Sequence, residues 1–234
     1  MRSRLLCSLF LGALVALGSG CLVSPQPSPP FEPDLAGERI GLTEAVELAG
    51  DLIGFGAPPG TVTPGGGDVI VTNLDDSLTP SVAHVAADGS FAIAVPGHPG
   101  QRFRFQARND GQRSEPYDLM VDANAIVATD LAAASPCLSI DPAGWVDFDV
   151  VGVGHSLVIT NGCGAPVTID PPRLRRGRAG FTFSPTNAIS LQDGEVATIT
   201  IIAKSAAETE DVLYLEVTAP APELRAVTLT LPDP

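Results

Sequence analysis

The chain has 234 residues, of which 44% are hydrophobic but only 5% aromatic, so its core must consist mostly of Val, Ile, Leu and Ala. Its 24 Gly and 22 Pro residues are typical of many short strands joined by tight turns. With 27 Asp and Glu against 13 Lys and Arg, the formal net charge is −14, which disfavours nucleic acid and anionic lipid headgroups as partners.

The amino terminus has the three-part layout of a secretory signal. Two arginines precede an apolar run over residues 5–17, which is shorter than the ~20 residues that a membrane-spanning helix needs. Residues 17–21 read Leu-Gly-Ser-Gly-Cys and resemble the lipobox of bacterial lipoproteins. That resemblance implies a signal peptide over residues 1–20 and lipidation of Cys21. The lipobox usually has Leu, Val or Ile where this chain has Gly18, so the alternative is an ordinary signal peptide with an incidental Cys21.

A proline-rich tether is predicted after Cys21, over residues 21–38. Residues 22–33 contain five prolines and favour extended polyproline geometry at about 3.1 Å per residue. This length would hold the first domain roughly 40 Å from the lipid. Gram-negative lipoproteins kept at the inner membrane tend to have Asp after the lipidated cysteine, so Leu22 implies the outer membrane. The sequence leaves open which side of that membrane the chain faces.

The cysteines predict one disulfide bond. Cys7 leaves with the signal and Cys21 is taken by the lipid, so Cys137 and Cys163 remain. An even number of remaining cysteines in an oxidising compartment favours a disulfide bond between these two. A zinc site is the alternative, although two thiols without a nearby His pair make a poor tetrahedral shell.

The first domain is predicted over residues 39–124 as a β-sandwich. Residues 90–95 (SFAIAV) place their large apolar side chains on one face. In residues 102–107 (RFRFQA), both phenylalanines point one way and both arginines the other. Gly-containing turns separate such segments every 8 to 12 residues or so, as in sandwiches.

Three segments of this domain occur in a familiar order. They are residues 69–73 (VIVTN), 87–91 (ADGSF) and 110–114 (DGQRS). This order resembles the bacterial immunoglobulin-like modules of surface and adhesin proteins, and it implies the fold while saying little about a ligand.

Four aspartates of this domain suggest a calcium site, namely Asp75, Asp76, Asp88 and Asp110. Their spacing does not match an EF-hand, and two of them precede glycine, a pattern chiefly found in turns. The turn interpretation is favoured, and no metal is predicted.

A second domain is predicted over residues 136–234, after a linker over residues 125–135. The alanine-rich stretch before it is interpreted as an edge strand of the first domain that leads into this linker. In the last predicted strand, residues 226–231, Val and Leu alternate with Thr. The prediction for the whole chain is therefore all-β: two tandem immunoglobulin-like β-sandwiches after a signal peptide and a Pro-rich tether.

The second domain also carries a resemblance. Residues 138–142 (LSIDP), 146–154 (VDFDVVGVG), 158–169 (VITNGCGAPVTI) and 191–195 (LQDGE) resemble the Hydin-like (ASH) or choice-of-anchor D domains of bacterial envelope proteins and ciliary scaffolds. Asp149 stands where that pattern usually has Gly. The resemblance implies a packing or scaffolding module and not an enzyme.

A local basic cluster stands out in this acidic chain, formed by Arg173, Arg175, Arg176 and Arg178. It is a candidate contact for a phosphate-bearing glycolipid or an acidic partner. The alternative, favoured by the neighbouring Pro and Gly residues, is a solvated loop whose arginines pair with the protein's own acids.

No catalytic constellation is recognisable. The histidines His84, His98 and His155 are isolated in sequence, and no Gly-x-Ser-x-Gly or phosphate-loop motif occurs. The prediction is a non-catalytic envelope lipoprotein without cofactor, which contributes to adhesion or assembly and binds another envelope protein. The alternative is a lipoprotein that captures a glycan, ion or peptide in its inter-strand loops.

Overall fold

The computed structural model describes residues 32–43, 52–123, 125–129, 131, 136–177, 180–205 and 210–231. Regular structure in these ranges is β-strand apart from one short 3-10 helix (η1, Gly37–Arg39), which confirms the all-β prediction. None of the helical structure described is long and apolar enough to cross a membrane. Cys21, the predicted signal peptide and most of the predicted tether lie outside the described residues.

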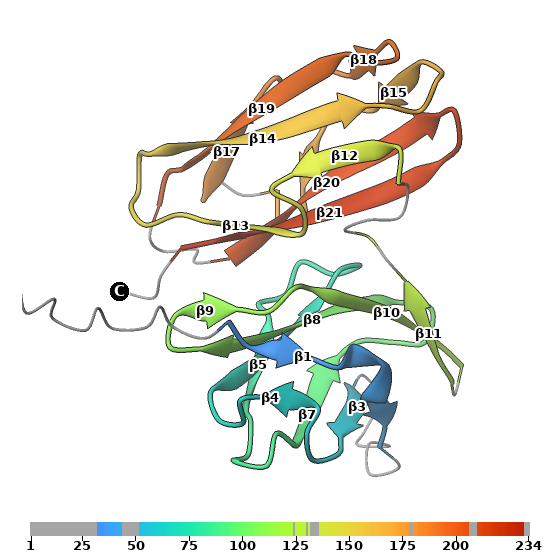
Figure 1. Ribbon diagram of the computed structural model, residues 1–234. Helices are drawn as coiled ribbons and strands as arrows, with labels where there is room; N and C mark the ends of the chain where they lie inside the picture. Colours follow the sequence, from blue (N-terminus) through green and yellow to red (C-terminus); the bar gives the residue numbers. More distant parts are fainter. Residues whose placement is uncertain are drawn as a thin grey trace, which may run out of the picture. The chain divides into compact units, whose positions relative to one another are not determined.

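The first sandwich comprises β1 to β11, coloured blue to green in Figure 1. Its main sheet has the order β11-β10-β8-β5-β6 with β9 on β8; a smaller sheet has the order β2-β3-β7, and β1 pairs with β4. The strand bounds are β1 Asp34–Leu35, β2 Gly41–Leu42, β3 Leu52–Ala57, β4 Val62–Thr63, β5 Asp68–Asn73, β6 Ser81–His84, β7 Phe91–Pro96, β8 Arg102–Asn109, β9 Gln112–Arg113, β10 Tyr117–Asp122 and β11 Ala125–Thr129.

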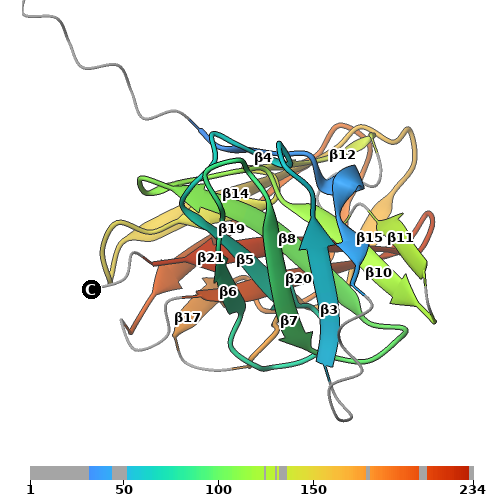
Figure 2. The same ribbon diagram turned by 90° about the horizontal axis from the view of Figure 1, so that it is seen from below.

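The core of this sandwich lies between the β2-β3-β7 sheet and the main sheet. In Figure 2, β3 and β7 lie in front of β5 and β8. Phe103 and Phe105 on β8 are fully buried, as the alternation in the sequence predicts. Their rings meet Phe55 of β3 edge to face, with centroids 5.2 and 5.0 Å apart, a favoured aromatic geometry.

A two-residue turn joins β8 to β9 and positions residues that matter below. Asp110 and Gly111 have φ angles of 47° and 78°. Positive φ at both central positions is the backbone of a type I′ hairpin, which Asp-Gly favours. Asn109 accordingly pairs with Gln112. The prediction that Asp110 is a turn residue is confirmed.

The second sandwich comprises β12 to β21, coloured yellow to red in Figure 1. Its sheets have the orders β12-β14-β19-β17 and β13-β21-β20-β15-β18, with β16 on β20. The strand bounds are β12 Leu138–Asp141, β13 Trp145–Asp147, β14 Gly154–Asn161, β15 Val167–Ile169, β16 Arg173–Leu174, β17 Phe181–Ser184, β18 Ile189–Leu191, β19 Val196–Ala203, β20 Glu210–Ala219 and β21 Glu223–Thr230.

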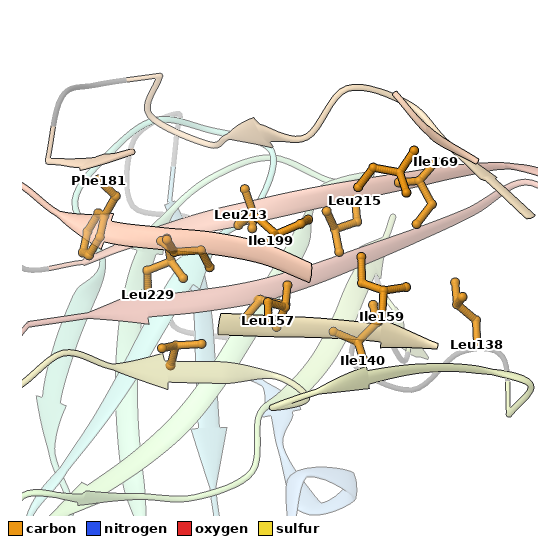
Figure 3. Close-up of a cluster of buried hydrophobic side chains, with 14 of the residues drawn as sticks. Leu138, Ile140, Leu157, Ile159, Ile169, Phe181, Ile199, Leu213, Leu215 and Leu229 are labelled. Atoms are coloured by element: carbon orange, nitrogen blue, oxygen red, sulfur yellow. The ribbon is translucent and has the colours of Figure 1, made fainter. Parts of the chain in front are cut away.

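The second core is aliphatic, as the low aromatic content requires. Figure 3 shows Leu157 and Ile159 of β14 together with Leu213 and Leu215 of β20 in one buried cluster. Leu229 of β21 belongs to the same cluster. Alternate residues of β20 and β21 thus fill the space between the two sheets, and the remaining residues of these strands must face the other way.

The boundary between the predicted domains needs a correction. The linker bounds of 125–135 start too early, because the edge strand expected in this stretch is β11, Ala125–Thr129, which pairs with β10 through five residues. The edge strand of the first sandwich therefore extends to Thr129. Residues 31–234 pack as one compact unit that holds both cores, so the two sandwiches are not separate domains joined only by a linker.

The predicted disulfide bond is present. Cys137 precedes β12 and Cys163 follows β14, and their Cα atoms are 4.7 Å apart. Leu138 pairs with Asn161 in the same antiparallel ladder, so strand pairing brings the two cysteines together. The bond ties the edge strand β12 to the sheet.

Replacing both cysteines with alanine is expected to destabilise the second sandwich. The bond closes a loop of 26 residues, for which the chain-entropy treatment of the unfolded state gives about 3 kcal/mol. Chemical denaturation should show a lower unfolding midpoint for the double variant, and added reductant should lower only the wild-type midpoint. Equal midpoints for variant and oxidised wild type would contradict this account.

Candidate functional site: the interface between the sandwiches and its cleft

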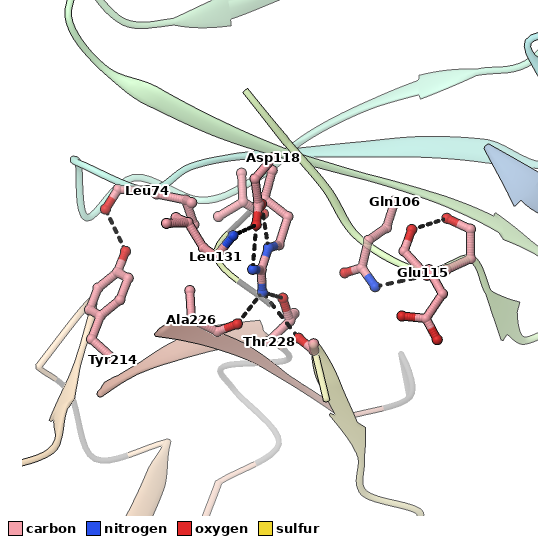
Figure 4. Close-up of polar contacts among 12 residues, drawn as sticks. Leu74, Gln106, Glu115, Asp118, Leu131, Tyr214, Ala226 and Thr228 are labelled. Atoms are coloured by element: carbon pink, nitrogen blue, oxygen red, sulfur yellow. Dashed lines mark hydrogen bonds and ion pairs between the residues drawn. The ribbon is translucent and has the colours of Figure 1, made fainter. Parts of the chain in front are cut away.

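A buried arginine on β8 connects the two sandwiches. Arg104 points away from the phenylalanine core and its side chain is only 1% exposed. Its Nε and Nη2 donate to the two carboxylate oxygens of Asp118 on β10, at 2.7 and 2.8 Å. Its Nη1 donates to second-sandwich acceptors: Ala226 O at 2.8 Å, Gly144 O at 3.1 Å and Thr228 Oγ1 at 3.2 Å (Figure 4). One guanidinium group therefore joins its own strand β8 to β10, to β21 and to the bend at Gly144.

A second buried polar contact lies along the same interface. Glu210, at the start of β20, accepts hydrogen bonds from two residues of the first sandwich. Thr72 Oγ1 donates to its Oε1 at 3.0 Å, and Arg113 Nη2 donates to its Oε2 at 3.1 Å. The Arg113 and Glu210 side chains are 8% and 9% exposed. Both ends of this ion pair are thus removed from water but paired.

An apolar cluster completes the interface. Leu74 and Leu131 pack there against Val212, Tyr214 and Ala226 of the second sandwich. The Tyr214 hydroxyl donates to Leu74 O, as Figure 4 shows. Burial raises the pKa of this phenol well above its usual value, so it remains a neutral donor. The outward-facing Val212 and Tyr214 of β20 therefore meet protein, whereas Glu216 and Thr218 further along the same face are exposed.

The predicted basic cluster contributes to this interface. Arg175 Nη1 donates to three first-sandwich carbonyl oxygens, those of Asn73 (2.9 Å), Asp76 (2.8 Å) and Leu78 (2.9 Å). Burial lowers the pKa of the Arg175 guanidinium. Its Nε and Nη2 have no acceptor among the described residues.

The other arginines of the cluster also contact this chain. The Arg173 guanidinium lies 4.4 Å from the centroid of the Tyr214 ring, a cation–π distance. The Arg176 backbone N–H donates to Asp211 Oδ1 at 3.1 Å, while Arg178 lies outside the described residues. Within the described residues, these guanidinium groups thus contact backbone carbonyls and an aromatic ring of the chain itself, and not the carboxylates that the solvated-loop alternative expects. Arg173 and Arg175 also line a cavity of about 590 Å³, and binding of an external anion there remains a prediction.

A cleft lies beside the interface. It has a volume of about 510 Å³ and is lined by both sandwiches. The first sandwich contributes the start of β5 and the β8–β9 hairpin, and the second contributes the end of β13 and the end of β21. The lining residues are Gly67, Asp68, Arg108, Asn109, Asp110, Gly111, Arg113, Asp147, Phe148, Asp149, Thr230 and Leu231.

Carboxylates outnumber cations in this cleft. Four aspartates line it against two arginines, and Arg108 pairs with Asp68 at 3.1 Å. Burial raises the pKa of Asp147, and repulsion by Asp149 and Glu210 adds to the effect, while Arg113 and His155 oppose it. Clefts of this size between domains are a common location of binding sites.

The other residues considered in the sequence do not converge on this cleft, apart from Asp110. Asp75 pairs with Arg102, and Asp88 accepts hydrogen bonds from Ser90 within its own turn. In the described ranges no group of three or more His, Cys, Asp or Glu residues is placed to hold a metal ion. His155 meets the Phe148 ring edge to face, with ring centroids 4.6 Å apart.

Sequence reasoning did not single out the interface residues Arg104, Asp118, Arg113, Glu210 and Tyr214. The sequence feature that could have indicated the interface is the alternation of Thr with Val and Leu in β21. Thr228 and Thr230 are almost completely buried, although their face was expected to be the polar one. A polar face composed of Thr, without Lys or Glu, suits contact with another protein surface.

Comparisons with known proteins show no family and only distant structural similarity. No protein-family model and no curated protein matches the chain in sequence. Similar solved structures include WR4, an MSP family member from C. elegans (12% identity, TM-score 0.36, 41% of this chain and 98% of that one). The E. coli chaperone DraB is 15% identical (TM-score 0.32, 42% of this chain and 55% of that one). The ASH/PapD-like domain 7 of human CEP192 is 13% identical (TM-score 0.31, 49% and 98%). All three TM-scores lie below 0.5, so the two β-sandwiches are described from this structure alone.

Replacing Arg104 with Met is expected to destabilise the chain by about 3–5 kcal/mol, because it leaves the Asp118 carboxylate buried without its partner. Arg102→Met is the matched control on the same strand. The Arg102–Asp75 pair is about one-quarter exposed, so its loss should cost about 1 kcal/mol or less. Urea unfolding monitored by tryptophan fluorescence measures both, and equal losses would contradict the role given to Arg104.

Replacing Asp211 with Asn is expected to change how stability depends on pH. Asp211 is fully buried, and burial raises its pKa above the ordinary 3.8, while hydrogen bonds from Val212 N and Arg176 N oppose the shift. A raised pKa in the folded state means that stability is highest below the unfolded-state pKa and falls as pH rises through the folded-state pKa. Denaturation midpoints measured from pH 3.5 to 7 should therefore show Asp211→Asn gaining stability relative to wild type as pH rises. A constant difference across that range would contradict the assignment.

Proposed function

We propose that the chain is a lipid-anchored, non-catalytic scaffold of a bacterial cell envelope that binds another envelope protein. The anchor is Cys21 and the tether is the proline-rich segment that follows it. The two sandwiches act as one binding unit, with the cleft as its recognition site. Leu22 after the lipidated cysteine supports placement at the outer membrane.

The observation that carries this proposal is the buried polar interface. Interfaces between domains of one chain are usually polar and allow relative motion. Here Arg104 and Arg113 each form a buried ion pair, and Arg104 adds three hydrogen bonds across the interface. Partners of buried charges must stay in place, because an unpaired buried charge is strongly unfavourable. The interface therefore suits a module that presents a fixed surface.

The alternative function, capture of a glycan, ion or peptide, is favoured by one feature, the cleft itself. Its polar lining is drawn from both sandwiches, as in many sites for small ligands. The two functions merge if the captured group belongs to a protein partner.

Replacing Cys21 with Ala tests the anchor. The variant should move from the membrane fraction to the soluble fraction, since no acyl chain can then be attached. Fractionation of cells followed by immunoblotting measures this, and the mass of the purified wild type should exceed that of its polypeptide by the lipid. Ser24→Ala, in the same tether, is the control and should stay with the membrane.

Crosslinking of intact cells tests the partner in the same strains. Wild type should crosslink to an envelope protein, and a crosslinker that cannot cross the membrane separates the exterior face from the periplasmic one. A Cys21→Ala protein that remains membrane-bound would overturn the anchor, and a wild type without crosslinked partners would overturn the scaffold.

A further inference from the structure

The cleft beside the interface has an unbalanced set of charges. Asp110 projects from the β8–β9 hairpin of the first sandwich, and Asp147 and Asp149 come from the second. Asp110 and Asp149 are exposed and form no ion pair with any described residue. The cations of the cleft are already engaged, Arg108 with Asp68 and Arg113 with Glu210. The surplus charge of this cleft is therefore negative.

A second, independent feature points to a ligand. Arg113 lines the cleft and is only 7% exposed, yet its Nη1 has no hydrogen-bond acceptor in the described part of the chain. Its Nη2 is used by Glu210. A buried N–H without an acceptor costs free energy, and an incoming oxygen atom recovers it once the guanidinium turns toward the cleft. The occupant of the cleft must therefore offer an acceptor near Arg113 and positive charge near the aspartates.

Three common ligand classes fit these requirements poorly. An anion would meet four aspartates in a chain of net charge −14. A bound metal ion needs several oxygen ligands together, and the described residues contain no such group. A sugar ring favours an exposed aromatic face, but Phe148, the one aromatic residue among those that line the cleft, is 0% exposed.

We propose that the cleft binds a basic peptide segment of the protein partner, in which a backbone carbonyl accepts from Arg113 and a Lys or Arg side chain lies between Asp110 and Asp149. A peptide supplies the neutral acceptor and the cation in one molecule. The volume of about 510 Å³ is that of sites that enclose a few residues or a small ligand. This inference rests on the proposed function and names the chemistry of its partner.

The test uses the detergent-solubilised full chain and a fluorescein-labelled peptide of alternating Lys and Ala. Fluorescence anisotropy should show saturable binding of this peptide, and no binding of the matching Glu-Ala peptide. The variant Asp110→Asn/Asp149→Asn should bind the Lys peptide about 3- to 10-fold more weakly, because two exposed ion pairs are lost. Asn at position 110 keeps the hairpin, since Asn-Gly also favours a type I′ turn.

The matched control is Asp122→Asn/Asp141→Asn, which removes the same charge at two exposed positions that do not line the cleft. It should bind as the wild type does. Equal weakening in both double variants would overturn the proposal, because binding would then reflect net charge alone. Calorimetry that detects Ca²⁺ binding at the cleft would likewise overturn it in favour of an ion site. Absence of peptide binding in the presence of an intact crosslinked partner would overturn the peptide site while leaving the scaffold standing.

Discussion

The structure depends on the burial of Arg104 between two sandwiches. Taking a guanidinium and a carboxylate out of water costs several kcal/mol per ion, and their attraction offsets this only when every donor and acceptor is satisfied. Asp118 satisfies two of the nitrogen atoms of Arg104, and the three acceptors of the second sandwich satisfy the third. Separation of the sandwiches would remove all three acceptors at once. The ion pair therefore selects one relative orientation more than it adds stability, which is a common consequence of burying charge.

Because of this constraint, the central strands of both sandwiches are covered on both faces. Strands β5, β8 and β10 are covered on one face by the aromatic core and on the other by the second sandwich. Strands β20 and β21 are in the same position, with Leu213 and Leu229 on one side and Tyr214 and Thr228 on the other. An antiparallel sheet commonly has one dry face and one wet face. Here the polar face is buried as well, and its polar groups find each other across the interface.

The burial of this polar face explains which features could be predicted from the sequence and which could not. Period-two alternation predicts two faces for a strand, and it correctly placed Phe103 and Phe105 in the core. Turn chemistry assigned the Asp-Gly turn, and the cysteine count assigned the disulfide bond. It does not reveal whether the polar face meets water or protein. The second-sandwich acceptors of Arg104 lie 40 to 124 residues away in the chain, so no local pattern could identify them. The edge strand expected at the end of the first sandwich is β11, but its bounds are set by its pairing with β10 and not by a local pattern, so the predicted linker began too early.

The cleft follows from the same constraint, because no single sandwich contains it. Asp110 belongs to a hairpin of the first sandwich, whereas Asp147 and Asp149 belong to the second, and only the fixed orientation brings their carboxylates to one opening. Burial raises the pKa of Asp147, and repulsion by Asp149 and Glu210 adds to the effect. A ligand that supplies positive charge offsets this repulsion, and because it needs residues of both sandwiches, its binding and the docking of the sandwiches must stabilise each other. Recognition at the cleft is then controlled by residues such as Arg104 that never touch the ligand.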